Sequence, residues 1–414
     1  MAQRGQVRRE RARIRSDHFS TGPYRGFVDT PGAVIQYVPR SGIVDLGWGH
    51  PLPALLPVEQ WSDAGRTALR EHGWQALTYG AAPGPGPLIA WLTDHLAEGD
   101  HSTRASEIFV TNGASHGLAL VADLLVDPGD VVLVDAPTYH LAFPILRDRR
   151  AELVGVPTDD RGVHPARTAE LLERLARDGR RVPMLYIVPT FANPTGRCLP
   201  PERRVELVDL ARRAGLTIVE DDTYRELAYD GPAPPSLWSL AERGTVVRLG
   251  TFAKTVAPGL RLGWINADED LVRRLTGLGY IHSGGGVNHT TALTMATFGT
   301  SGAYRRHLSA VRGHYAAQRD ALVAGLRASA PDLRISVPGG GWFLWAELPP
   351  PVTASALAPV AEAHGVAYVE GSRFFADGAG GDRAIRLSFS MLPPDELQQA
   401  AARLGEAVRS AQAR

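Results

Sequence analysis

Short apolar runs alternate with segments of helical periodicity through the middle of the chain, and this alternation constrains the fold most strongly. The runs "EIFVTNG", "VVLVDAP", "AELVGVP", "MLYIVPT", "TIVEDD", "VVRLGT" and "RLGWINA" have the length and composition of buried strands. Between them lie stretches such as "SHGLALVADLLV" and "YHLAFPILRD", and a further helix is expected over about Glu202 to Ala214. Strands alternating with crossover helices predict an α/β fold whose mostly parallel sheet is flanked by helices.

The composition and the hydrophobic pattern of the sequence change near residue 300. A long Arg/Ala-rich helix is expected from about Ala303 to Ala330, followed by "RISVPGGGWFLWAELP", a helix, "GVAYVEGS", "AIRLSFS" and a terminal helix from about Pro394. These segments predict a smaller α+β C-terminal domain over 301–414, after a large domain over 58–300. The N-terminal segment, 1–57, is expected to join the smaller domain.

Charge and composition exclude several classes of partner. The chain has 44 basic and 44 acidic residues, a formal net charge of +0, so neither a nucleic-acid nor a membrane partner is expected. An arginine-rich stretch, Arg4 to Arg15, is interpreted as a solvated leader rather than a binding arm. One cysteine, Cys198, and the lack of a run of about 18 apolar residues favour a cytoplasmic protein.

Lys254, in "GTFAKTVAPGLRLGW", is the only lysine in the chain. A coding bias toward arginine explains the missing lysines but does not explain why this one is kept. Only lysine can lose its proton near neutral pH and attack a carbonyl as a neutral amine. We therefore expect Lys254 to take part in chemistry.

The ends of the predicted strands carry polar side chains that suit one cofactor. In open parallel sheets, ligands bind beyond the carboxyl ends of the strands. These ends supply the lysine amine, a carboxylate, amide and hydroxyl donors, an arginine, an aromatic ring and a helix start, from Lys254, Asp221, Asn193, Tyr224, Arg261, Tyr139 and the run "GASHG". Such a set can hold pyridoxal phosphate: the lysine binds it covalently, the carboxylate keeps its pyridine nitrogen protonated, and the helix start and arginine bind its phosphate.

The motifs "NPTG", "EDDTYREL" and "TFAKTVAPGLRLGW" resemble those of fold type I pyridoxal-phosphate enzymes of the class I/II aminotransferase family. The resemblance is closest to the aminoadipate aminotransferase branch and extends from "GHPLPALLP" to "AIRLSFS". It implies the fold type I architecture and a pyridoxal 5'-phosphate-dependent aminotransferase that acts on an α-amino acid.

The resemblance also implies a role for each matching residue. Lys254 forms the Schiff base and moves the Cα proton, and Asp221 pairs with the pyridinium. The remaining cofactor contacts come from Asn193 and Tyr224 at the ring oxygen, Tyr139 on the ring face, and Ala114, Ser115, Thr251 and Arg261 at the phosphate. Tyr79 matches a tyrosine that reaches the phosphate of the neighbouring subunit, which implies a homodimer with shared active sites. Arg386 matches the arginine that binds the substrate carboxylate, and Gly49 and Asn193 are expected beside it.

Some alternatives stay open at this point. The same residues serve γ-elimination, replacement or a cyclising carbon–carbon bond formation, because all begin by stabilising the same carbanion. Arg386 can instead belong to a structural ion pair, and Tyr139 to plain packing, while Trp342 and Trp345 are expected in the core. Ala253 and Glu370 depart from the family pattern. So does the run Gly284–Gly286, which is interpreted either as a tight turn or as a roomier opening for substrate.

Three patterns in the sequence bear on other functions. "GASHG" satisfies the G-x-S-x-G pattern of an α/β-hydrolase, with Ser115 as nucleophile. A transcription regulator with an aminotransferase-like domain needs a winged helix ahead of it, and only about 40 residues precede "IVDLGWGHP". "GAAPGPG" lacks the preceding strand of a dinucleotide site. His282 and His289 have no carboxylate pattern between them, so no metal site is expected.

Overall fold

The computed structural model describes residues 40–99, 103–242, 244–284 and 286–413. These residues belong to one compact unit, Pro39–Arg414. The arginine-rich stretch Arg4 to Arg15 and Gly285 lie outside the described residues.

A seven-stranded sheet forms the centre of this unit, with the strand order β2-β10-β9-β8-β7-β3-β4. Its strands are β2 (Ile108–Thr111), β3 (Val131–Val134), β4 (Glu152–Gly155), β7 (Met184–Ile187), β8 (Thr217–Asp221), β9 (Val246–Thr251) and β10 (Gly263–Asn266). The pairs from β4 to β9 are parallel, and β10 is antiparallel to both β9 and β2. The expected α/β fold with a mostly parallel sheet is therefore confirmed.

Both faces of the sheet are covered by helices, which explains why its strands read as continuous apolar runs. In β3, Val132 and Val134 face one core and Val131 and Leu133 face the other, as the alternation of side chains along a strand requires. The first core also contains α3 (Ala114–Leu125), α4 (Ala142–Arg147) and α8 (Glu269–Thr276). The second contains α5 (Pro165–Arg177), α6 (Pro201–Ala214) and α7 (Leu237–Leu240).

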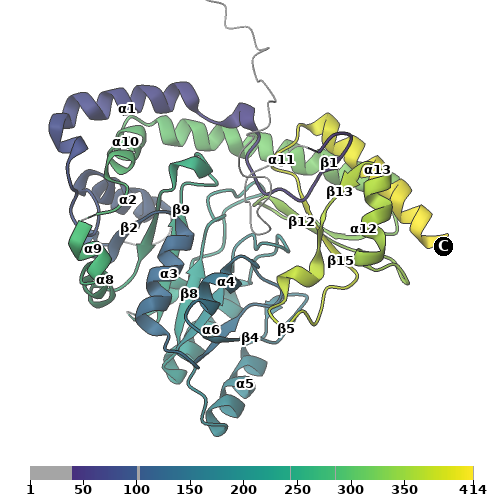
Figure 1. The fold of residues 1–414 in the computed structure, drawn as a ribbon, viewed down its shortest axis with the longest axis horizontal. Coiled ribbons are helices and arrows are strands. Elements are labelled where there is room, and N and C mark those ends of the chain that lie inside the picture. The colour runs from purple at the N-terminus through teal and green to yellow at the C-terminus, as the bar shows by residue number, and fades with distance from the viewer. Residues whose placement is uncertain (1–39, 100–102, 243, 285, 414) are drawn as a thin grey trace, which may run out of the picture. The chain divides into compact units, whose positions relative to one another are not determined.

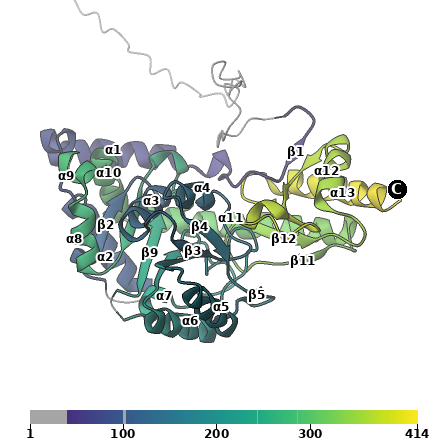
Figure 2. The ribbon, with the colours of Figure 1, turned by 60° about the horizontal axis from the view of Figure 1, so that its bottom comes forward.

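A third core joins long helices to a smaller sheet. The helices α1 (Val58–His72), α2 (Gly86–Gly99), α10 (His289–Thr300) and α11 (Ala303–Ser329) contribute to it, and α9 (Gly279–Gly284) precedes α10. The smaller sheet is antiparallel, with the order β11-β12-β15-β14: β11 (Arg334–Ser336), β12 (Phe343–Glu347), β15 (Ala384–Ser388) and β14 (Val369–Glu370). Figures 1 and 2 show these C-terminal strands beside the central sheet, with α12 (Ala354–Ala363) and α13 (Pro394–Gln412) next to them.

Shorter elements complete the described chain. They are β1 (Val44–Asp45), which pairs in parallel with β13 (Val366–Ala367), the hairpin of β5 (Thr158–Asp159) and β6 (Gly162–Val163), and the 3-10 helices η1 (Pro53–Leu55), η2 (Gly73–Leu77), η3 (Ala105–Glu107), η4 (Pro258–Leu260) and η5 (Gly371–Phe374). Within the described ranges, no helix combines the length and apolar character needed to cross a membrane.

Candidate active site

Lys254 lies in the loop that follows β9, with its amine above two aromatic rings. The Nζ atom is 4.8 Å from the ring centroid of Trp342 and 5.9 Å from that of Tyr224. No described residue gives this amine a hydrogen bond or an ion pair. Burial lowers the pKa of Lys254 to about 8; Asp221 opposes this shift, while Arg386 and Arg261 add to it. A substantial fraction of the amine is therefore neutral near physiological pH.

Asp221 ends β8 and is buried. Its Oδ2 atom accepts a hydrogen bond of 2.7 Å from the hydroxyl of Tyr186 in β7, and its Oδ1 atom accepts one from Thr223. Burial raises the pKa of Asp221, and these two donors oppose that shift because they stabilise the carboxylate. Tyr186 was not identified from the sequence, because its role depends on how β7 is aligned with β8.

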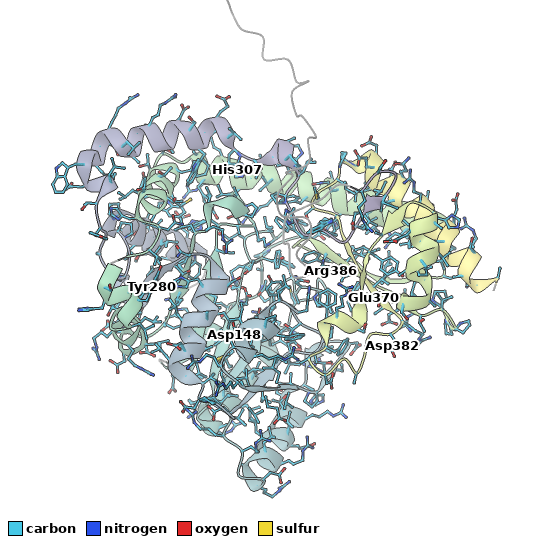
Figure 3. The ribbon with its side chains drawn as sticks, viewed as in Figure 1. Asp148, Tyr280, His307, Glu370, Asp382 and Arg386 are labelled. Atoms are coloured by element: carbon cyan, nitrogen blue, oxygen red, sulfur yellow. The ribbon has the colours of Figure 1, made fainter. Side chains whose placement is uncertain are left out.

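Arg386 is a buried cation in β15 (Figure 3). Its Nη1 atom donates 3.0 Å to Oδ1 of Asn193, and its Nη2 atom donates 2.5 Å to the carbonyl of Gly47. Its Nε atom is buried without a hydrogen-bond partner, and no carboxylate of the described residues lies within ion-pair distance. Burial lowers the pKa of Arg386 to about 10. The structural ion pair considered for Arg386 is thus absent from the described part of the chain.

The guanidinium of Arg261 lies close to the turn that precedes α3. Its Nη2 atom donates 3.3 Å to the carbonyl of Asn112, and a Cβ atom on Gly113 would lie 3.0 Å from the same Nη2 atom. Gly113 also has a φ of +86°, which favours glycine. Next to this turn, Ala114 and Ser115 begin α3, whose first-turn amides have no partner within the helix. A guanidinium and free amides thus converge where an anion can bind.

Thr251 ends β9 at the same edge of the sheet. Its hydroxyl donates 3.2 Å to the carbonyl of Leu262 and accepts a bond of 3.1 Å from the amide of Ala253. These bonds fix the first turn of the loop that carries Lys254.

Tyr139 is half-buried in the loop between β3 and α4, and burial with the nearby Asp221 charge raises its pKa to about 12. The helix α4 begins only at Ala142, so Tyr139 and His140 are in the loop rather than in the helix expected over "YHLAFPILRD". His140, which the sequence did not single out, lies edge-on to Phe374 at 4.9 Å. Burial lowers the pKa of His140 to about 4, and Arg386 and Arg373 lower it further.

Two expected site residues, Tyr79 and Gly49, form no hydrogen bond with the other site residues in the described part of the chain. Tyr79 is 84% exposed and has no bond or ring contact to the other site residues in the described part of the chain. Gly49 lies against Phe343: a Cβ atom there would be 2.6 Å from the ring's Cζ atom. Close approach also explains Gly286, whose amide donates 3.2 Å to the carbonyl of Gly80 and where a Cβ atom would lie 2.1 Å from the carbonyl oxygen of Ala81.

A protein-family model described as aminotransferase class I and II matches residues 41–404. This chain belongs to the class I and II aminotransferase family. The match spans the central sheet, the site and the smaller sheet, so the resemblance stated from the motifs is confirmed.

Individual relatives place this aminotransferase in the aminoadipate-like branch. The aromatic-amino-acid aminotransferase 1 of Thermococcus litoralis is 33% identical over 91% of this chain and 90% of its own length. The crystal structure of kynurenine aminotransferase from Pyrococcus horikoshii matches with a TM-score of 0.84 and 30% identity over 89% of this chain and 91% of that one. The α-aminoadipate aminotransferase of Thermus thermophilus, complexed with N-(5'-phosphopyridoxyl)-L-leucine, matches with a TM-score of 0.78 and 31% identity over 90% of this chain and 94% of that one.

The cofactor of this aminotransferase is pyridoxal phosphate. The described residues fit it: an amine without a partner, a buried carboxylate at a strand end, and a glycine turn with free amides beside an arginine. Ser115 forms no hydrogen bond with a histidine in the described chain, so the geometry gives no support to a serine hydrolase.

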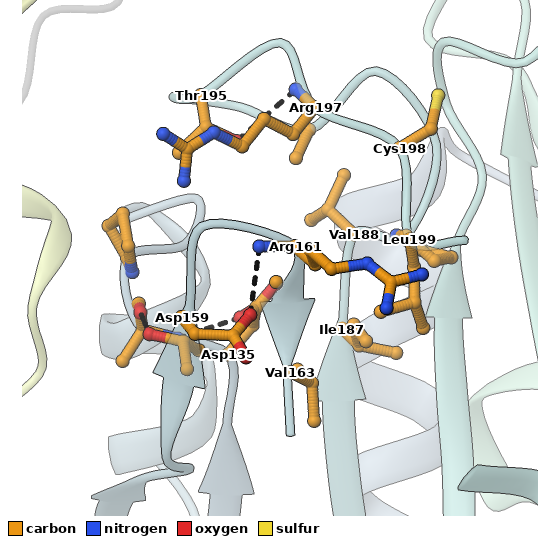
Figure 4. Close-up of a pocket in the computed structure, with 16 residues that line it drawn as sticks. Asp135, Asp159, Arg161, Val163, Ile187, Val188, Thr195, Arg197, Cys198 and Leu199 are labelled. Atoms are coloured by element: carbon orange, nitrogen blue, oxygen red, sulfur yellow. Dashed lines mark hydrogen bonds between the residues drawn. The ribbon is translucent and has the colours of Figure 1, made fainter. Parts of the chain in front are cut away.

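A cavity of about 80 Å³ lies beside the loop that carries Asn193 (Figure 4). Ala192 and Thr195 of that loop line it together with Asp135, which follows β3. Burial raises the pKa of Asp135 to about 7, although the amide of Ala136 donates to its carboxylate. The sequence alone did not indicate Asp135 as a site residue.

Proposed function

We propose that this aminotransferase transfers the amino group of an α-amino acid to a 2-oxo acid, and that Arg386 binds the α-carboxylate of both. The buried guanidinium without a carboxylate partner carries the proposal. Burying an unpaired charge is costly, so a substrate carboxylate that restores the ion pair gains a strong and oriented contact. Asn193 holds one edge of the guanidinium, and the Nε atom keeps a free donor.

When bound, pyridoxal phosphate supplies an electron sink for the electrons released at the substrate Cα. Lys254 would hold the cofactor covalently and then move the Cα proton as a neutral amine. A pKa near 8 suits both tasks, because such an amine exchanges its proton readily near neutral pH. Asp221 would accept the pyridinium N–H, with Tyr186 and Thr223 keeping its carboxylate oriented.

The remaining contacts divide between the ring and the phosphate. Asn193 and Tyr224 would donate to the ring oxygen, and Tyr139 would cover one ring face. The phosphate would be bound by Arg261, Thr251 and the first amides of α3, at Ala114 and Ser115. Gly49 would lie beside the substrate carboxylate, with its backbone packed directly on Phe343.

We also propose a homodimer in which Tyr79 reaches the phosphate of the partner's cofactor. Its support is the exposure of Trp74, Leu77, Tyr79 and Tyr280, which are 67% to 84% exposed. Large apolar side chains exposed to this degree favour an interface with another chain. Light scattering should give twice the 44.5 kDa chain mass, and Tyr79→Phe should weaken cofactor binding without dissociating the dimer. A monomer with full activity would contradict this part.

The substrate is proposed to be an amino acid with a large side chain, because the similar enzymes are named for aromatic amino acids, kynurenine and α-aminoadipate. A cytoplasmic, biosynthetic role is proposed with it. The test is to incubate the loaded enzyme with ¹⁵N-labelled amino acids and a panel of 2-oxo acids. Transfer of ¹⁵N to the acceptor supports transamination. Loss of a β or γ substituent, or a new carbon–carbon bond, without transfer would instead support the elimination or cyclising alternative.

A further inference from the structure

Two consecutive aromatic residues, Trp342 and Phe343, each lie beneath one of the two cations of the site. Trp342 directly precedes β12 and Phe343 begins it. The Nζ atom of Lys254 is 4.8 Å from the ring centroid of Trp342, and Cζ of Arg386 is 4.2 Å from that of Phe343. The sequence predicts Trp342 in the core, and it is fully buried, but it also contacts the proposed catalytic amine.

The two rings are held firmly by their surroundings. Tyr224 packs edge-on against both, with centroid distances of 5.9 Å to Trp342 and 5.8 Å to Phe343. On another side, Tyr315 of α11 packs against Trp342 at 5.6 Å. Gly49 leaves no gap over Phe343, since even a Cβ atom there would approach the ring to 2.6 Å. Neither ring can move away from its cation without displacing these neighbours.

An aromatic face attracts a cation through its quadrupole, but it carries no net charge and forms no ion pair. A carboxylate in the same place would bind the cation strongly and compete with the ligand. A purely aliphatic surface would give no compensation for burial. The contact that Trp342 makes with the amine is through its ring face, since Nζ of Lys254 lies over the indole ring.

We propose that Trp342 and Phe343 are positioning residues: an aromatic floor that orients Lys254 and Arg386 without an ion pair, and so leaves the amine of Lys254 without a competing partner and the donors of Arg386 free for substrate. This inference rests on the roles proposed above for those two cations. Other charged groups also act on the amine: Asp221 from β8 favours its protonated form, and Arg386 and Arg261 disfavour it. The floor adds a contribution that favours the protonated form.

The single lysine makes this measurable. Full-length apo protein can be labelled with acetic anhydride over a range of pH, and peptide mapping separates Lys254 from the N-terminal amine. Trp342→Leu should lower the pKa of Lys254 by about 0.5 to 1, whereas Trp342→Phe, which keeps an aromatic face, should restore most of the difference. Tyr315→Leu is the matched control, because Tyr315 packs on Trp342 without contacting the amine.

Phe343 should affect the other cation. Phe343→Leu should raise the KM for amino acids about 3- to 10-fold and leave the pKa of Lys254 unchanged. The thermal midpoint of each variant, measured beside the control, reports the general cost of lost packing.

The proposal is overturned if Trp342→Leu and Tyr315→Leu shift the pKa of Lys254 equally, or if Trp342→Phe behaves as Trp342→Leu. It is also overturned if Phe343→Leu changes only the thermal midpoint. A failure of the proposed function is recognised separately, in the parent protein, by the lack of a lysine-bound cofactor or of amino transfer.

Discussion

Two buried arginines of this chain, Arg204 and Arg386, show how differently the same cation can be surrounded. Arg204, in α6, donates to the carbonyls of Leu199, Pro235 and Pro189 at 2.8, 3.0 and 2.6 Å and to Thr190 at 3.0 Å. The carboxylate of Glu220 is 3.9 Å away. Arg386 has two hydrogen bonds, an unpartnered Nε atom and no carboxylate neighbour in the described chain.

This difference separates a structural cation from a binding cation. The donors of Arg204 tie α6 to the loops around it, so its burial is compensated within the protein itself. The burial of Arg386 is compensated only in part, and the remainder is available to a ligand. Lys254 resembles Arg386 in this respect, because its amine also lacks a partner among the described residues.

The largest effect is expected at Lys254. Lys254→Ala should lower kcat by at least about 10²- to 10⁴-fold, because both covalent binding and proton transfer are lost. Single-turnover assays with saturating pyridoxal phosphate will measure this. An activity within tenfold of the parent enzyme would show that the amine is not a reacting group.

Arg386→Met should separate binding from stability. The kcat/KM for amino acids should fall roughly 30- to 1000-fold, corresponding to about 2 to 4 kcal/mol, while cofactor loading is retained. The thermal midpoint should stay or rise, because an incompletely compensated buried charge is removed. A large loss of stability with an unchanged KM would reassign Arg386 to the structural class.

Arg204→Met is the reciprocal experiment. The free energy of unfolding should fall by about 3 kcal/mol, since several buried carbonyls lose their donor and Glu220 loses its neighbouring cation. The KM for amino acids should not change. Denaturant titration and steady-state kinetics on the same preparation check both values, and a selective rise in KM would remove the contrast with Arg386.

The pH dependence of cofactor uptake tests whether Lys254, like Arg386, is a buried cation without a compensating partner. Only the neutral amine attacks the aldehyde, so the rate of uptake should rise about tenfold per pH unit below pH 8 and level off above it. Stopped-flow absorbance on the apo protein gives this profile. A rate that continues to rise toward pH 10 would mean that burial does not lower the pKa.

Tyr186→Phe should have the smallest effect. Loss of its hydrogen bond to Asp221 raises the pKa of that carboxylate and should weaken cofactor binding about fivefold, near 1 kcal/mol. Equilibrium titration with pyridoxal phosphate measures this change. An unchanged dissociation constant would show that Thr223 alone orients Asp221.

The sequence predicted the strands of the central sheet, because their apolar runs are continuous and bounded. It also predicted that Asp221 stands at the end of β8 and that Lys254 follows β9. It did not identify Tyr186 or the contact of Trp342 with Lys254, because both depend on strand register and on packing between distant segments. The helices α1 and α2 were not assigned. The proposed domain boundaries, and the role of Tyr79, stay predictions.

The most direct test of the central claim uses the fact that Lys254 is the only lysine. The protein is loaded with pyridoxal phosphate, reduced with borohydride and analysed by peptide mass spectrometry. The account predicts the mass of the reduced cofactor on the peptide that contains Lys254, in nearly every chain. An unmodified Lys254, with the label absent or confined to the N-terminal amine, would contradict it.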